Sequence, residues 1–217
     1  MYDRPMQRGQ ILTVVRAASA GLVLIAIVAQ AIELANNGVF DATRFFAFFT
    51  IQSNLIGVAA FVWLILSRNA TRSRGLELLR GAAAVYLTVT FFVVLILLAG
   101  VDVGLQLAWV DFALHKFFPV VVVLDWIIDP PRMRLTYRDA LTWLIYPLIW
   151  TGLTLVRGAA DRWYPYPFLD PANGGYGQVA LTAVAVTIAF LVIALVTIAI
   201  GNARGGTEAG AVTTPPR

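Results

Sequence analysis

The sequence predicts an all-α, polytopic membrane protein: a bundle of six transmembrane helices with both termini in the cytoplasm. Three observations lead to this prediction: the composition, the length of the apolar segments and the distribution of arginine. Of the 217 residues, 59% are hydrophobic and 13% are charged, and the mean hydropathy is +0.79. Soluble domains contain roughly 25% charged residues. The apolar excess therefore indicates a chain that lies mostly in lipid.

The apolar residues form segments long enough to cross a bilayer, which takes about 20 helical residues. No segment between them is large enough to form a core of its own. We expect a short N-terminal tail over 1–10, one membrane domain over 11–200 and a disordered C-terminal tail over 201–217, which is rich in Gly, Thr and Pro. The expected spans are 11–33, 43–66, 80–100, 104–128, 138–157 and 178–200.

The first span also has an interpretation as a signal peptide. It follows Arg4 and Arg8, and Ala-Gln-Ala at 29–31 fits the small-x-small pattern of a cleavage site. Its apolar run is longer than the hydrophobic region of a signal peptide, so we expect a retained helix.

Arginine is concentrated in alternate loops. The N-terminal tail, the second and fourth loops and the C-terminal tail carry most of it, and the third loop has none. An even number of spans places both termini on one side, and the positive-inside rule assigns that side to the cytoplasm. The chain has no cysteine, which excludes disulfides and thiol catalysis. No basic–aromatic pattern indicates a nucleic-acid partner.

The second span carries an unusual polar stretch, FFTIQSNLIG at 48–57. Thr50, Ser53, Asn54 and Gly57 follow i, i+3, i+4, i+7 spacing and share one helix face, whereas Gln52 points elsewhere. Polar groups are costly in hydrocarbon unless another group satisfies them. Small and amide residues commonly pack membrane helices together, so packing alone is one interpretation of this face.

The fourth span contains a cluster of ionisable residues. Asp111 and His115 are four residues apart and share a face, and Lys116 follows directly. His115 is the only histidine and Lys116 the only lysine. Pro119 has no N–H to donate to the carbonyl of His115, which we expect to be left free. Such a cluster is a functional candidate that should face the bundle interior, and the alternative is an ion pair that only stabilises the bundle.

The second and fourth spans bring two reactive groups to similar depths. At 1.5 Å per residue, Thr50 lies roughly 12 Å and His115 roughly 16 Å below the outer face. A hydroxyl beside an imidazole, with a carboxylate behind it, can form an activated nucleophile with histidine as general base. Spacing leaves Thr50 and Ser53 nearly tied as the nucleophile. Asp111 either orients the imidazole or is an unrelated anchor.

Supporting roles are also predicted for polar and aromatic residues around this pair. Asn54 and Gln52 are candidate oxyanion or orienting groups. Trp163 and Tyr166 fit an interfacial aromatic belt or the mouth of a lipid-sized pocket, and Tyr146, next to Pro147, either marks a kink or lines such a pocket. With one histidine and no convincing ligand spacing, we expect no metal site, and no glycine-rich loop indicates a phosphate cofactor.

Four segments occur in an order that resembles a known family: FFTIQSNL, HKFFPVVVVLDW, WLIYPL and WYPYPFLD. Over residues 11–200 the chain is similar to the bacterial six-helix branch of the androgen-induced and androgen-dependent TFPI-regulating protein family. Animal members are intramembrane hydrolases that cleave fatty acid esters of hydroxy fatty acids with a threonine nucleophile and a histidine. By position, the resemblance implies these roles for Thr50 and His115, and it favours Thr50 over Ser53.

We therefore expect an intramembrane hydrolase of lipid esters, located in the bacterial inner membrane with its pocket nearer the outer face. Its partners would be membrane lipids and a fatty-acyl ester substrate. One alternative is a small transporter or proton-coupled channel, with Asp111, His115 and Lys116 as a relay. Another is a non-catalytic scaffold whose polar groups only pack helices.

Overall fold

The computed structural model describes residues 4–100 and 107–210, and over these ranges every regular element is a helix. The all-α fold class is therefore confirmed. In chain order the elements are α1 (Arg4–Asn36), α2 (Ala42–Phe45), α3 (Phe49–Leu66), α4 (Arg74–Ile96), α5 (Ala108–Phe112), the π-helical η1 (Ala113–Phe117), α6 (Phe118–Ile128), α7 (Tyr137–Asp161), the 3₁₀ turns η2 (Pro167–Leu169) and η3 (Pro171–Asn173), and α8 (Gly175–Gly210).

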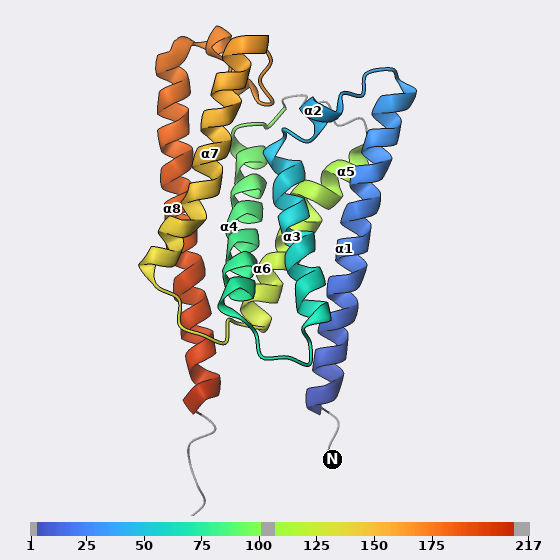
Figure 1. The fold of residues 1–217 in the computed structure, drawn as a ribbon, viewed down its shortest axis with the longest axis vertical. Helices are drawn as coiled ribbons and strands as arrows, with labels where there is room; N and C mark the ends of the chain where they lie inside the picture. The colour runs from blue at the N-terminus through green and yellow to red at the C-terminus, as the bar shows by residue number, and fades with distance from the viewer. Residues whose placement is uncertain (1–3, 101–106, 211–217) are drawn as a thin grey trace, which may run out of the picture.

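The long helices run side by side along one axis (Figure 1). α4 is central and packs against α3, α6 and α8, while α1 packs against α3 and α7 pairs with α8. The start of α1 and the end of α8 lie at the same end of the bundle, which we call the terminal end. α2 lies at the opposite end, called the loop end. That the terminal end faces the cytoplasm stays a prediction.

Five of the described helices, α1, α3, α4, α7 and α8, are long and apolar enough to cross a membrane. The segment expected as the fourth span is not a single α-helix. It is divided into α5, η1 and α6, which follow one another without a break from Ala108 to Ile128. An integral membrane protein is supported by these helices, whereas the count of six spans stays a prediction.

α8 extends beyond the boundary that the sequence predicted at residue 200. It continues to Gly210, so the expected disordered tail begins too early, and residues 211–217 lie outside the described ranges. A tertiary contact holds the first turn of this extension. The Asn202 side chain accepts from the backbone N–H of Leu135 at 2.9 Å and donates to its carbonyl at 2.9 Å. At the other terminus, α1 already begins at Arg4 within the expected tail 1–10.

Gly57 lets α3 approach its neighbours closely. A Cβ at this position would lie 2.7 Å from Cε1 of Phe118 and 2.9 Å from Cδ1 of Leu87. Both distances are well inside van der Waals contact. The absence of a side chain therefore brings the polar face of α3 against η1–α6 and α4, as small residues commonly do in membrane bundles.

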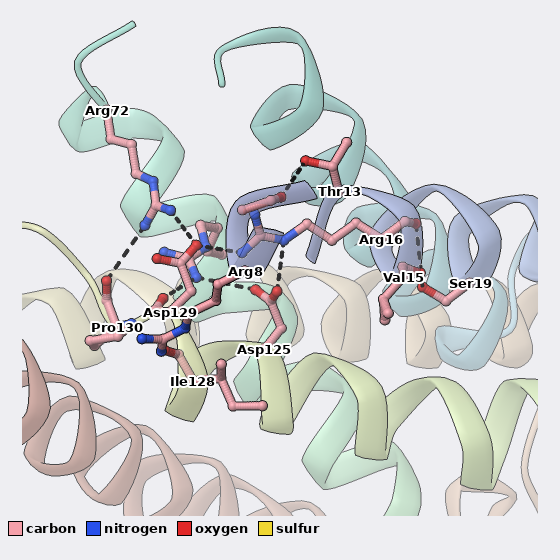
Figure 2. A network of polar contacts seen from close by, with 12 residues as sticks. Arg8, Thr13, Val15, Arg16, Ser19, Arg72, Asp125, Ile128, Asp129 and Pro130 are labelled. Atoms are coloured by element: carbon pink, nitrogen blue, oxygen red, sulfur yellow. Dashed lines mark hydrogen bonds and ion pairs between the residues drawn. The ribbon is translucent and has the colours of Figure 1, made fainter. Parts of the chain in front are cut away.

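Buried ion pairs join the helices at the terminal end (Figure 2). Asp125 accepts from Arg16 at 2.7 Å and from Arg80 at 3.2 Å, which links α6 to α1 and α4. The network contains three arginines and three acidic residues, namely Arg16, Arg72, Arg80, Glu77, Asp125 and Asp129.

Gly57→Ala should destabilise the bundle, because its methyl group would displace Phe118 and Leu87 from a close-packed core. We expect the free energy of unfolding to fall by about 1–3 kcal/mol. Gly21→Ala in α1 is the matched control, since no atom lies within 4 Å of a Cβ there. Thermal unfolding midpoints in detergent test this prediction. Equal midpoints for the two variants would contradict the close approach.

Candidate active site

Thr50 lies in the first turn of α3, which begins inside the bundle. The N-cap residue Phe48 provides no side-chain hydrogen bond to the helix. First-turn N–H groups have no carbonyl partner within their own helix. The N–H of Thr50 instead donates to the Tyr166 hydroxyl at 3.2 Å. Thr50 is buried, and its side chain lies at the positive end of the helix dipole.

His115 lies in the middle of the π-helical turn η1, whose geometry follows from Pro119. The N–H of Phe118 donates to the carbonyl of Ala113, five residues earlier. In this register the missing N–H of Pro119 falls opposite Leu114, and the Leu114 carbonyl accepts from Nδ2 of Asn54 at 3.2 Å. The sequence-based expectation of a free His115 carbonyl assumed α-helical spacing. In the wider π-helical turn, the carbonyl that Pro119 leaves without a backbone donor is instead that of Leu114.

The structure brings three predicted residues into one hydrogen-bonded chain. Oγ1 of Thr50 lies 3.1 Å from Nε2 of His115, and Nδ1 of His115 lies 2.8 Å from Oδ1 of Asp111. Oδ2 of Asp111 accepts from the Lys116 ammonium at 3.0 Å. Thr50 and His115 are buried, whereas the Asp111 side chain is one-third exposed. A hydroxyl, an imidazole and a carboxylate in this order form the arrangement of an activated nucleophile.

Tyr166 touches the hydroxyl of Thr50 as well as its N–H. The two side-chain oxygens are 3.3 Å apart. Tyr166 comes from the segment before η2, and its buried ring stacks on Phe168 and meets Phe48 edge-on. The sequence predicted this residue only as part of a mouth or belt. Its contact with Thr50 had no signal in the sequence, because it depends on how the long loop folds back into the bundle.

The other polar residues of α3 have separate partners. Oγ of Ser53 donates to the carbonyl of Thr50 at 3.1 Å and lies 3.3 Å from Oγ1 of Thr90. Nδ2 of Asn54 also donates to the carbonyl of Thr50, at 2.8 Å. Gln52 donates to the carbonyl of Phe46 at 2.7 Å and accepts from the Tyr146 hydroxyl. These contacts hold the backbone of the turn, and the hydroxyl that faces His115 belongs to Thr50 rather than Ser53.

Two apolar cavities meet at Thr50 and Tyr166, which line both of them. The first, of about 60 Å³, lies between α4, α7 and α8 and is called the α8 cavity. The second, of about 50 Å³, reaches α1 through Leu34, is also lined by His115, and is called the α1 cavity. The hydroxyl–imidazole pair thus borders space bounded mainly by aliphatic and aromatic side chains.

Tyr146 and Trp163 do not line either cavity. The Tyr146 ring stacks on Tyr86, and its hydroxyl is engaged by Gln52. The Trp163 ring packs edge-on against Phe48, while the guanidinium groups of Arg44 and Arg157 lie 5.4 and 5.2 Å from its ring centre. Tyr146 therefore packs from α7 against α3 and α4, and Trp163 packs against Phe48 and two arginines, so neither lines the space beside Thr50. No group of His, Asp and Glu suited to a metal occurs within the described residues.

Comparison with protein-family models, with curated proteins and with solved structures finds no match to this chain. The function is therefore argued from the geometry of the site.

Thr50 should be the residue that reacts with a fluorophosphonate, because its hydroxyl alone faces the imidazole. Peptide mapping of the labelled protein should place the adduct on Thr50. Labelling should be lost in Thr50→Ala and His115→Ala but retained in Ser53→Ala. An adduct on Ser53 would contradict the assignment.

Proposed function

We propose that this protein is an intramembrane hydrolase of fatty-acyl esters, with Thr50 as nucleophile and His115 as general base. One observation carries the proposal: the Thr50–His115–Asp111 hydrogen-bonded chain lies between two apolar cavities within a bundle of membrane-type helices. A buried hydroxyl with a base at hydrogen-bond distance suits acyl transfer. The apolar surroundings suit a substrate that comes from the bilayer.

In the first step, the Thr50 hydroxyl attacks the ester carbonyl carbon while its proton passes to Nε2 of His115. Nδ1 of His115 keeps its proton and hydrogen-bonds through it to Asp111, which orients the ring and stabilises the imidazolium. Lys116 pairs with the second carboxylate oxygen, so Asp111 has a cationic partner before the imidazole becomes charged. The tetrahedral intermediate then expels the alcohol, which takes the proton back from Nε2, and an acyl-Thr50 ester remains.

Two hydrogen-bond donors are available for the negative charge on the carbonyl oxygen. They are the N–H of Thr50, at the dipole-positive start of α3, and the Tyr166 hydroxyl, which now accepts from that N–H. An oxyanion beside Thr50 would accept from both. Preorganised donors of this kind are often the largest single contribution to catalysis of acyl transfer. Asn54 and Gln52, which the sequence proposed for this role, are occupied with backbone carbonyls.

The acyl-enzyme is resolved by water. His115 removes a proton from the water, the hydroxide attacks the acyl-Thr50 carbonyl, and the Thr50 oxygen leaves with the proton from Nε2. The fatty acid is released and the enzyme returns to its starting state. The partly exposed Asp111 and Lys116 lie on the side of His115 away from Thr50, which is a suitable side for solvent exchange.

The substrate class follows from the cavity walls. Leu148 lines the α8 cavity and is itself 50% exposed, so this cavity reaches the lipid-facing surface of α7. We infer that an acyl chain enters laterally at this point. The resemblance to the family of threonine hydrolases implies catalytic roles for the same two residues, Thr50 and His115. It would place the protein in a bacterial inner membrane, with the loop end outward.

The alternative of a transporter or proton channel has less support. A relay through Asp111 and His115 would need a polar route toward the terminal end. One turn beyond Asn54, the space around Gly57 is filled by Phe118 and Leu87, and Phe61 packs edge-on against Phe118. This apolar layer lies between the candidate site and the ion-pair network.

Loss of the hydroxyl or the imidazole should abolish ester hydrolysis by the purified protein. On medium-chain p-nitrophenyl esters, Thr50→Ala and His115→Ala should lower kcat by about a thousandfold or more, and Asp111→Asn and Tyr166→Phe by about a hundredfold. Thr88→Ala is the matched control, because among the described residues the Thr88 hydroxyl donates to the carbonyl of Ala84 in its own helix and not to the site. Unchanged turnover in Thr50→Ala or His115→Ala would rule out the mechanism.

Filling the α8 cavity should change the preferred chain length. Ala183 lines this cavity, so Ala183→Phe should lower kcat/KM about tenfold or more for an eight-carbon ester and much less for an acetate ester. Ala185→Phe, on the exposed face of α8, is the control. An equal effect on both esters would show that the acyl chain lies elsewhere.

A further inference from the structure

A third cavity lies at the terminal end of the bundle, and neither Thr50 nor His115 lines it. Its volume is about 590 Å³, and it is bounded by α1, the α3–α4 connection and the residues that follow α6. We call it the arginine basin, and define it by the charged residues that line it: Arg8, Arg16, Arg68, Arg72, Asp129 and Arg132.

Part of this charge is neutralised within the protein. Arg16 and Arg72 both pair with Asp129, and Arg16 also pairs with Asp125 (Figure 2). The network described above contains equal numbers of arginines and carboxylates. Its charges therefore balance, and its members are held in place before any ligand arrives.

Three arginines that line the basin do not belong to this charge-balanced network. In the described part of the chain, Arg8, Arg68 and Arg132 form no ion pair with an acidic side chain. Arg8 donates to the carbonyl of Ile128 at 2.5 Å, which fixes its guanidinium at the rim but leaves its charge uncompensated. Arg68 and Arg132 are exposed. The cavity thus has an excess of three positive charges contributed by three separate segments.

We propose that the arginine basin binds a phosphate-bearing anion. Guanidinium groups match phosphate oxygens in bidentate geometry. A phosphate between these residues would supply the missing negative charge and would bridge α1, the α3–α4 connection and the α6–α7 connection. A general bias of arginine toward one side of a membrane accounts for basic loops. It does not require three unpaired arginines to converge on one cavity.

The surroundings of the basin favour a lipid headgroup as the source of the phosphate. Leu12 and Ile128 are apolar residues that line the basin beside its arginines, and Ile128 is itself exposed. A headgroup in the basin would leave room for acyl chains beside Ile128. Basic pockets between membrane helices commonly bind anionic lipids in this way. Free phosphate carries the same chemistry and is the second source to be tested.

The test uses the purified full-length protein in a neutral detergent and measures its thermal unfolding midpoint. Short-chain phosphatidylglycerol should raise the midpoint by several degrees, and phosphatidylcholine should not. Arg68→Gln/Arg132→Gln should remove most of that shift and weaken the apparent Kd by about tenfold or more. These exposed residues form no ion pair in the described structure, so the variant should fold. Arg138→Gln, a basic residue outside the basin, is the control and should keep the full shift.

The outcomes distinguish the sources. Phosphatidylglycerol retained by the wild type and lost from the double variant in native mass spectrometry supports a lipid headgroup. If inorganic phosphate at constant ionic strength raises the unfolding midpoint and the lipid does not raise it, the result supports a soluble phosphate. No shift with either ligand, or an equal loss of the shift in Arg138→Gln, would overturn the proposal.

Discussion

The hydrogen bond between the Thr50 hydroxyl and the His115 imidazole is the contact on which the proposed chemistry depends. It joins residues 65 positions apart at a distance of 3.1 Å. Three features of the backbone make it: α3 begins inside the bundle, η1 widens into a π-helical turn before Pro119, and Gly57 lets the two segments approach. Each feature lacks a group that a regular helix would have: α3 has no side-chain cap, Pro119 has no backbone N–H and Gly57 has no side chain. The site uses the hydrogen-bonding capacity or the space that is left.

Polar groups in this bundle are gathered at two levels separated by an apolar layer. Near the loop end they form the candidate active site, and at the terminal end they form the ion-pair network and the arginine basin. Burial of charge without partners is costly, so the two levels are satisfied by different means. The site uses hydrogen bonds between side chains and freed backbone groups, whereas the network balances arginines against carboxylates. The proposed phosphate would complete the second level without contact with the first.

The α3 sequence contains more polar residues than the proposed reaction uses. Ser53 and Asn54 both donate to the carbonyl of Thr50, so they stabilise the turn that carries the nucleophile. Gln52 instead connects α3 to α7 through Tyr146. This helix face therefore carries two kinds of contact: most of its polar residues position the backbone, and one presents its hydroxyl to the imidazole.

The sequence alone determined the helical class and the apolar segments, and it placed Asp111 and His115 on one helix face, because these follow from composition and from spacing within one helix. It also predicted similar depths for Thr50 and His115. Only the tertiary structure decided which hydroxyl faces the imidazole, brought Tyr166 to Thr50 and extended α8 past residue 200. Those features depend on a π-helical turn, a long loop and an Asn202–Leu135 contact. Helical periodicity carries no information about such contacts, since they join residues that are far apart in the chain.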